Sequence, residues 1–318
     1  MAKKIDEKQL IEAIKNGDRF ALSRAITLAE STKIEHLEIA HNIINSFPPN
    51  LNTKRIAITG IPGVGKSTFI EALGSFLTNN GHKVAILAID PSSNLSKGSI
   101  LGDKTRMEDL ARNDLAYIRP SATNGNLGGI TSRTYEAILL CEAAGYEHII
   151  IETVGVGQSE TLVNQITDIF IFLQLPGSGD DLQGIKRGIM EIADIIFINK
   201  TDSFQEKLVK DAKSDLAQSL QFLPTKKSNW KRKTILGSGL KEKGIVELWE
   251  TVENYFHQIK ENNFYQENRI LQRQLQTKTY ILELIERNIK ELLENNPLDT
   301  ENENAFLMAK EWIKKYNI

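Results

Sequence analysis

The sequence has little of what marks secreted or membrane proteins. It holds one cysteine, Cys141, in 318 residues, which excludes a disulfide framework and a CxxC metal site and favours a packed thiol on a helix. The N-terminus, M-A-K-K-I-D-E-K, lacks the apolar core of a signal peptide, and no apolar run reaches the roughly eighteen residues of a membrane span. We therefore expect a cytoplasmic protein.

Excess charge and histidine clusters are also missing. The formal net charge of −2 provides no overall field for nucleic acid or an anionic membrane, so we expect neither as a partner. The histidines are scattered along the chain, at His36, His41, His82, His148 and His257. This spacing predicts no cluster that could carry a transferred metal. Apolar residues make up 41% of the chain, which is enough for a substantial core.

What is present is a phosphate-binding loop. Residues 60–67 read G-I-P-G-V-G-K-S, between an apolar run and a predicted helix, Thr68–Leu77. In such a loop, backbone N–H groups surround a polyphosphate, Lys66 reaches the β- and γ-phosphates, and the Ser67 hydroxyl coordinates Mg²⁺. A chance glycine-rich turn is the alternative, but the fixed spacing favours a nucleoside triphosphate site. The expected nucleotide ligands here are Gly60, Gly63, Val64, Gly65, Lys66, Ser67 and Thr68.

Between residues 54 and 256, apolar runs alternate with helical patterns. Most runs are continuously apolar, as in a parallel sheet covered on both faces. We therefore predict an α/β fold with a doubly wound, mostly parallel sheet and ligand sites at the carboxyl ends of its strands. The predicted strands are Arg55–Thr59, Lys83–Ile89, Ala116–Arg119, His148–Glu152, Asp168–Leu175, Ile195–Asn199 and Thr234–Leu236.

The two ends of the chain have helical patterns. An amphipathic segment ends at Gly17, Asp18 can cap a second helix containing the apolar Phe20, Ile26 and Leu28, and a third helix starts near Ile34. Pro48-Pro49 then begins a linker. We divide the chain into an N-terminal helical region (1–50), a P-loop domain (51–260) and a C-terminal helical arm (261–318).

A heptad-like apolar seam runs along the C-terminal region. The seam sits on a helix of about thirty residues, roughly 45 Å long. Two interpretations stay open: the helix folds back on its own domain, or it pairs with a second subunit. We favour pairing and expect a homodimer. The seam residues are Leu271, Leu275, Leu282, Ile285, Ile289 and Leu292.

The motif N-K-T-D at 199–202 indicates which base is bound. It follows the strand at 195–198, and the Asp202 carboxylate can accept hydrogen bonds from guanine N1–H and the 2-amino group, which adenine cannot offer. Asn199 would brace the loops, and the Lys200 stem would cover the base. The backbone of Ser238, Gly239 and Leu240 can serve guanine O6. Ser238-Gly239 stands where GTPases usually carry Ser-Ala.

Three acidic residues are candidates for a metal and hydrolytic cluster. Asp90 ends one predicted strand, Asp103 lies in the loop G-S-I-L-G-D-K-T-R-M, and Glu152 ends another strand. Together with Ser67, they offer the oxygen ligands that Mg²⁺ prefers beside phosphates. One or two of them could instead cap helices or hold loops.

The chain resembles the MeaB/ArgK GTPases, the methylmalonyl-CoA mutase-associated branch of the metallochaperone-type P-loop GTPases. The resemblance covers nearly the whole chain, and the 98–107 and 175–188 segments are its most specific parts. The matching segments are 17–31, 60–68, 88–93, 98–107, 119–129, 151–160, 175–188 and 199–202.

This resemblance implies GTP hydrolysis in the service of another enzyme. The implied partner is an adenosylcobalamin-dependent acyl-CoA mutase, for methylmalonyl-CoA or isobutyryl-CoA, whose cofactor loading the GTPase gates and which it protects or reactivates. The implied ligands are GTP or GDP and Mg²⁺. The catalytic residues carried over are Lys66, Asp103, Glu152 and, on an additional switch loop at 176–188, Lys186.

The hydrolytic machinery looks incomplete. Gln158 comes three residues after Gly155, so its role in positioning water is open, and no arginine is obviously placed as a finger. Such a site should turn over slowly until a partner completes it. Two other functions remain as alternatives: a metallocentre-insertion GTPase, and a kinase of a periplasmic amino-acid binding protein.

Overall fold

The structure is a computed structural model of the whole chain. It describes residues 6–48, 50, 52–90, 107–122, 127–153, 159–177, 187–296, 298 and 304–316. Within these ranges, the side chains of 90, 121, 122, 127–131, 159 and 187 are not described. Asp103, Gln158 and Lys186 therefore lie outside the described residues, and only the backbone of Asp90 is covered.

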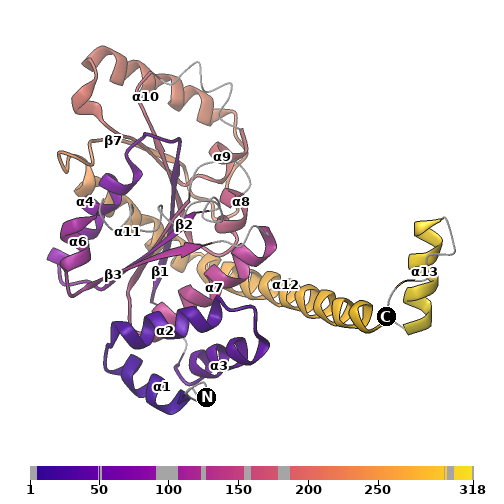
Figure 1. Cartoon of the computed structure of the whole chain (residues 1–318). Helices are drawn as coiled ribbons and strands as arrows, with labels where there is room; N and C mark the ends of the chain where they lie inside the picture. Colours follow the sequence, from indigo (N-terminus) through magenta and orange to yellow (C-terminus); the bar gives the residue numbers. More distant parts are fainter. Residues whose placement is uncertain are drawn as a thin grey trace. The chain divides into compact units, whose positions relative to one another are not determined.

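The centre of the molecule is a seven-stranded parallel sheet in the order β3-β2-β4-β1-β5-β6-β7 (Figure 1). All seven predicted strands are present, with ends shifted by up to three residues. The largest shift is in β3, which pairs with β2 up to Asp90 and Ala122. The strands are β1 Lys54–Gly60, β2 Val84–Asp90, β3 Ala116–Ala122, β4 His148–Glu152, β5 Ile169–Gln174, β6 Ile195–Ile198 and β7 Lys233–Leu236.

The winding of the sheet reverses beside β1. From β1 the chain moves outward to β2 and β3, returns to β4 next to β1, and then crosses to β5 on the other side. Ligands of open α/β sheets bind where the strand order reverses, outside the carboxyl ends of the strands. The loop that follows β1 occupies this position, which confirms the predicted doubly wound α/β fold.

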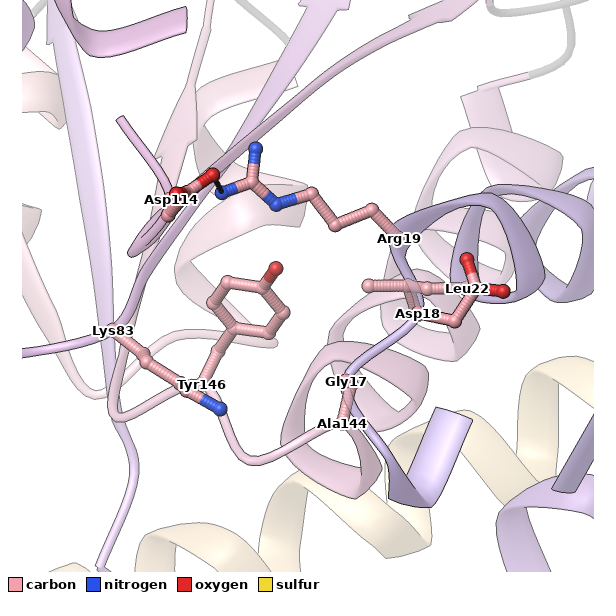
Figure 2. Close-up of a pocket in the computed structure, with 8 residues that line it drawn as sticks. All are labelled: Gly17, Asp18, Arg19, Leu22, Lys83, Asp114, Ala144 and Tyr146. Atoms are coloured by element: carbon pink, nitrogen blue, oxygen red, sulfur yellow. Dashed lines mark hydrogen bonds and ion pairs between the residues drawn. The ribbon is translucent and has the colours of Figure 1, made fainter. Parts of the chain in front are cut away.

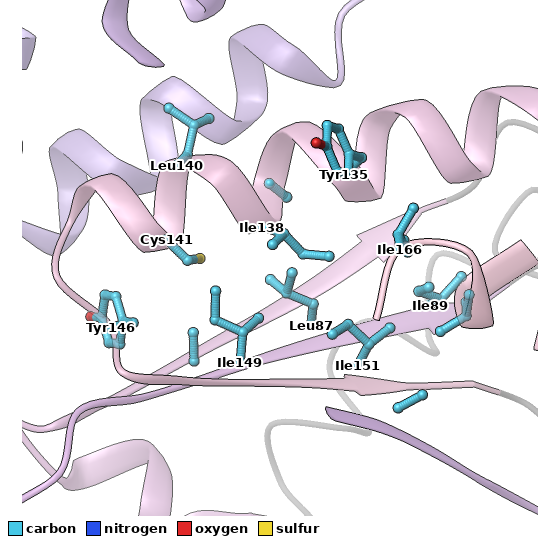
Figure 3. Close-up of a cluster of buried hydrophobic side chains, with 14 of the residues drawn as sticks. Leu87, Ile89, Tyr135, Ile138, Leu140, Cys141, Tyr146, Ile149, Ile151 and Ile166 are labelled. Carbon is cyan, nitrogen blue, oxygen red and sulfur yellow. The ribbon is translucent and has the colours of Figure 1, made fainter. Parts of the chain in front are cut away.

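Helices cover both faces of the sheet. Because successive strand residues point to opposite faces, Ile149 and Ile151 belong to one buried cluster and Ile150 to the other. The first cluster packs under α7 and includes Cys141, which is fully buried, as Figure 3 shows. The second packs under α4 and α11. The main helices are α4 Lys66–Asn79, α6 Glu108–Arg112, α7 Leu127–Ala143, α8 Ser159–Asn164, α9 Arg187–Ile192, α10 Glu206–Gln221 and α11 Ile245–Glu261.

The three predicted N-terminal helices are present as α1 Glu7–Lys15, α2 Arg19–Ala29 and α3 Ile34–Asn45. Asp18 caps α2, accepting hydrogen bonds from the amides of Phe20 (2.7 Å) and Ala21 (3.2 Å). Helices α2 and α3 pack against α7 and extend the first buried cluster outward. Phe20, in contrast, is 88% exposed, because α2 turns its opposite face to α7.

Helix α12, Phe264–Asn295, begins on the α/β core. Its first turns are held by a buried ionic network: Arg269 Nε lies 2.7 Å from Asp168 Oδ1, and Arg269 Nη1 lies 3.1 Å from Glu142 Oε1. The same Glu142 receives two hydrogen bonds from Arg55 of β1, at 2.8 and 2.9 Å. These bonds join the start of α12 to the strand that leads into the phosphate-binding loop.

The chain forms two compact units, Met1–Gln272 and Arg273–Ile318. The second contains the rest of α12 and α13, Ala305–Tyr316. On it, Leu282 and Ile285 are about half exposed. In the described part of the chain, no helix has the length and apolar character needed to span a membrane. The predicted division at residues 50 and 260 stays a prediction.

Candidate nucleotide-binding site

The loop between β1 and α4 has the backbone shape of a phosphate cradle. Gly63 and Gly65 adopt left-handed conformations, with φ of 79° and 92°, which side chains other than glycine rarely tolerate. The N-cap residue of α4 is Gly65, which has no side chain to bond the first N–H groups of the helix, so these groups can serve a ligand. An uncapped helix N-terminus with inward-pointing amides is a ready site for phosphate.

Lys66, the first residue of α4, is held within the loop. Its Nζ donates a 2.9 Å hydrogen bond to the carbonyl oxygen of Gly60. Burial lowers the pKa of Lys66, while the negative charges of Glu152 and Glu160 oppose this shift. A triphosphate adds negative charge beside the ammonium group, so its binding should favour the charged form of Lys66 further. Ser67 follows in the same turn and is partly exposed.

Acidic residues meet at the same edge of the sheet. Glu152 ends β4 and lies in register with Ala88 of β2 and Ile58 of β1. It is 9% exposed. Asp90 ends β2 two residues beyond Ala88, so its backbone lies at this edge also. The structure therefore brings Glu152 to the phosphate-binding loop, while the positions of the Asp90 and Asp103 side chains stay predictions.

Two further groups at this edge were not predicted. Glu160, in α8, is 1% exposed and close enough to influence Lys66. The Thr153 hydroxyl donates a 2.7 Å hydrogen bond to the Thr59 hydroxyl, which ties the segment after β4 to the end of β1. Both residues lie in the E-T-V-G-V-G-Q-S-E segment, so the sequence signal was present, but only the sheet register shows what they contact.

The N-K-T-D loop is joined directly to the phosphate-binding loop. Asn199 Nδ2 donates to the carbonyl oxygen of Val64 at 2.9 Å, and its Oδ1 accepts from the amide of Gly239 at 2.8 Å. Lys200 Nζ donates to the carbonyl oxygen of Gly63 at 2.8 Å. The predicted bracing role of Asn199 thus has a concrete form: one buried side chain links three loops.

Asp202, the residue predicted to read the base, lies at the surface. It is exposed, on the short 3₁₀ helix η2, Thr201–Ser203. A hydrogen bond from the Ser238 side chain helps to hold the pKa of Asp202 below its usual value, so the carboxylate is ionised. An exposed, ionised carboxylate beside the loops that hold phosphates is what guanine recognition requires.

The glycine at 239 has a steric explanation. A Cβ atom added there would lie 2.8 Å from the Cα atom of Phe69 in α4, so alanine does not fit without a backbone shift. The amides of Ser238 and Gly239 are engaged by Lys243 and Asn199, respectively. We therefore expect the next amide, that of the 70% exposed Leu240, to serve guanine O6.

The prediction that the histidines form no cluster is wrong for two of them. His82 and His148 lie close together with Glu147, at the amino-terminal edge of the sheet, which is opposite the nucleotide edge. They are far apart in the sequence, and the parallel pairing of β2 with β4 brings them together. A pocket near this edge, lined by Lys83, Tyr146 and Arg19 among others, is shown in Figure 2.

A phosphate loop at the reversal point of a parallel sheet, bonded to an N-K-x-D loop, defines the P-loop GTPases, and this molecule is one of them. A model of the family described as methylmalonyl Co-A mutase-associated GTPase MeaB matches residues 22–296, and the chain belongs to that family.

Individual relatives agree with this assignment. The GTPase ArgK of Escherichia coli is 47% identical over 255 residues, covering 79% of this chain and 77% of the relative. The mitochondrial methylmalonic aciduria type A homolog of Mus musculus is 41% identical over 302 residues, covering 91% and 71%. A crystal structure titled LAO/AO transport system kinase superposes with a TM-score of 0.74 at 33% identity, covering 99% of this chain and 95% of the other.

Proposed function

We propose that this GTPase is a chaperone for an adenosylcobalamin-dependent acyl-CoA mutase, acting on methylmalonyl-CoA or isobutyryl-CoA. GTP hydrolysis gates the loading of the cofactor and protects or reactivates the mutase. The observation that carries the proposal is the family match over residues 22–296, because the family is described as mutase-associated. The mouse relative, named for methylmalonic aciduria, supports the same assignment.

The site residues fit a Mg²⁺-GTP complex. Ser67 stands one residue after Lys66 in the first turn of α4, where a hydroxyl can meet a cation on the β- and γ-phosphates. Glu152 provides a carboxylate at the same edge. Asp90 and Asp103 complete the proposed oxygen ligand set. When bound, Mg²⁺ neutralises charge that develops on the phosphates.

The chain's own residues would then position the nucleotide and the water. Lys66 stabilises the negative charge on the γ-phosphate, the backbone amides of 63–68 hold the phosphate oxygens, and Asp202 selects guanine. Glu152 and Asp103 are the proposed hydrolytic carboxylates. We propose that intrinsic turnover is slow and that Lys186, on the switch loop, completes the site when the mutase docks.

Co-purification tests the partnership. The tagged protein, loaded with GDP or with a non-hydrolysable GTP analogue, is used to capture proteins from a cell extract. Recovery of a cobalamin-dependent mutase, dependent on the nucleotide, is the expected result. Recovery of a metalloenzyme precursor or of a periplasmic binding protein that becomes phosphorylated would instead support one of the two alternative functions.

Single-turnover hydrolysis tests the regulation. We expect the correct mutase to raise the GTP hydrolysis rate at least about tenfold, which is about 1.4 kcal/mol of barrier. Lys186→Ala should keep GTP binding and basal hydrolysis and lose the stimulation, while the exposed Lys213→Ala serves as the matched control. Equal loss of basal and stimulated rates in Lys186→Ala would make Lys186 an ordinary active-site residue.

A homodimer and a cytoplasmic location belong to the same proposal. The half-exposed apolar residues on α12, including Leu282 and Ile285, support pairing with a second copy. A contiguous apolar patch on the surface of a helix typically marks an interaction site. A mutase chaperone must also share a compartment with its client, which makes the cytoplasm the expected site of action.

A further inference from the structure

We propose that His82, Glu147 and His148 form a binding site for a divalent transition metal, with Zn²⁺ as the best fit. One ligand atom from each of the three residues lies within 4.8 Å of the others. The site would be separate from the Mg²⁺-GTP site, because it lies at the amino ends of β2 and β4, whereas the nucleotide loops lie at the carboxyl ends.

His148 gives the strongest indication of a ligand. Its side chain is almost fully buried, at 2% exposure, and among the described residues neither Nδ1 nor Nε2 has a hydrogen-bond partner. Buried polar atoms of native proteins are normally satisfied, so an imidazole with two unsatisfied nitrogens needs an explanation. The ring lies 4.9 Å from that of His82, centroid to centroid, so the two imidazoles are neighbours.

The other two ligands are already paired with each other. His82 Nδ1 lies 2.8 Å from Glu147 Oε2, and the backbone amide of Lys83 donates to Glu147 Oε1 at 3.3 Å. The Lys83 amide is outside the ligand set, and metal-bound carboxylates are typically fixed by such a hydrogen bond. The side chains of His82 and Glu147 are 39% and 48% exposed, so a metal ion can enter from solvent.

The distances require only a small closure. Ligand atoms on one tetrahedral Zn²⁺ lie about 3.3–3.5 Å apart, since each bond is about 2.0–2.1 Å long. In the structure, the three ligand atoms lie up to 4.8 Å from one another. Movement of the two exposed side chains by about 1 Å would bring these atoms to the distances that Zn²⁺ requires. Two nitrogens and one carboxylate oxygen suit Zn²⁺ better than Mg²⁺ or Ca²⁺, which prefer oxygen ligands only. A water molecule would take the fourth position.

The electrostatic surroundings are compatible with this ligand set. Zn²⁺ coordinates a neutral imidazole, and burial of the His148 ring favours that form. The Lys54 ammonium group opposes a cation, but it lies 2.9 Å from Glu253 Oε1, which offsets its charge. The lone thiol does not compete, because Cys141, on α7, is buried in the core.

Zinc binding by the full chain tests this proposal. The chelator-treated protein, with GDP and excess Mg²⁺ occupying the nucleotide site, is titrated with Zn²⁺ alone against a chromophoric chelator. We expect one Zn²⁺ per chain, with affinity reduced at least about tenfold in His82→Ala and in Glu147→Gln. Substitution with Co²⁺ should give the visible absorption of a site with low coordination number.

The matched control is His257→Ala. His257 forms a similar exposed pair with Glu261, at 3.4 Å, and no third ligand joins this pair in the part of the chain that the structure describes. This variant should bind Zn²⁺ as the wild type does. His148→Phe fills the buried volume and should abolish binding; if it fails to fold, the two exposed variants decide the question. Unchanged Zn²⁺ affinity in both His82→Ala and Glu147→Gln would overturn the proposal, as would equal loss in His257→Ala.

Discussion

The side-chain amide of Asn199 donates a 2.9 Å hydrogen bond to the carbonyl oxygen of Val64, which ties the guanine-reading loop to the phosphate-binding loop. The other end of the same amide accepts from the Gly239 amide. We therefore expect binding of base and binding of phosphate to be coupled through this one buried residue. A nucleotide that orders one loop should also position the other.

Asn199→Ala should weaken both stability and GTP binding. The Val64 carbonyl and the Gly239 amide are buried, and each unsatisfied group costs about 1–3 kcal/mol. Denaturant unfolding and titration with a fluorescent GTP analogue measure the two effects. Asn295→Ala is the control, because the bond of that exposed amide stays within its own helix, to the Glu291 carbonyl. Unchanged GTP affinity in a destabilised Asn199→Ala would show that the two loops act independently.

Asp202→Asn should change the base preference from guanine to xanthine. The amide replaces one of two acceptors with a donor, so guanine loses one charge-assisted hydrogen bond while xanthine, which carries an oxygen in place of the 2-amino group, gains one. We expect a loss of GTP affinity of about ten- to a hundredfold. Competition binding with GTP, XTP and ATP checks this. The control is Ser203→Ala, next to Asp202, which should keep the guanine preference. Hydrolysis of ATP by the wild-type protein would contradict the assignment of Asp202 to guanine recognition.

Gly239→Ala should destabilise the base-binding loop. The added methyl group would lie 2.8 Å from the Phe69 Cα atom, and overpacking of this kind costs about 1–3 kcal/mol. Thermal unfolding and GTP affinity should both fall. Gly188→Ala is the opposite case, because no heavy atom of the described residues would lie within 4 Å of a Cβ atom at that helical position. This substitution should stabilise by about 0.4–1 kcal/mol. Equal effects in the two variants would rule out the steric explanation.

Acid should weaken the buried network at Glu142. Although burial opposes it, the charges of Arg55 and Arg269 hold the pKa of Glu142 below its usual range. A carboxyl group with a lowered folded-state pKa stabilises the fold above its unfolded pKa, and this stabilisation is lost as the pH falls through the folded pKa. The free energy of unfolding should therefore fall below about pH 4.5.

Glu142→Gln isolates that contribution. At neutral pH, it should cost about 3–5 kcal/mol, because it leaves buried arginine charges uncompensated. Its free energy of unfolding should depend less on pH in the acid range than that of the wild type. Glu206→Gln is the control, since the Glu206–Lys210 pair is exposed on α10 and solvent screens it. An unchanged acid slope in Glu142→Gln would assign the acid sensitivity to other groups.

Charged residues in the apolar seam of α12 should abolish dimerisation. Leu282 is 57% exposed in the single chain, and Leu282→Asp with Ile289→Asp would place unpaired carboxylates in a subunit interface, at a cost of several kcal/mol, roughly. Size-exclusion chromatography with light scattering should show a wild-type dimer and a monomeric double variant. The control is Lys290→Asp, at an exposed residue that does not belong to the seam; this variant should remain dimeric. A monomeric wild type would remove the pairing hypothesis.

The sequence alone determined the elements and the chemistry that local spacing encodes. Continuous apolar runs predicted all seven strands, Asp18 predicted the start of α2, and the phosphate and N-K-x-D motifs predicted the nucleotide, because each depends on residues adjacent in the chain. Asn199 was predicted to brace the loops, but its two partners come from distant segments. No local pattern specifies such partners.

The tertiary structure decided what strand pairing brings together. The parallel register of β2 with β4 placed His82 beside His148, although 65 residues separate His82 from Glu147, and the close approach of Phe69 required a glycine at 239. Spacing along a chain reports which side chains share an element. Contacts between elements depend on sheet order and helix packing, which only the folded chain contains.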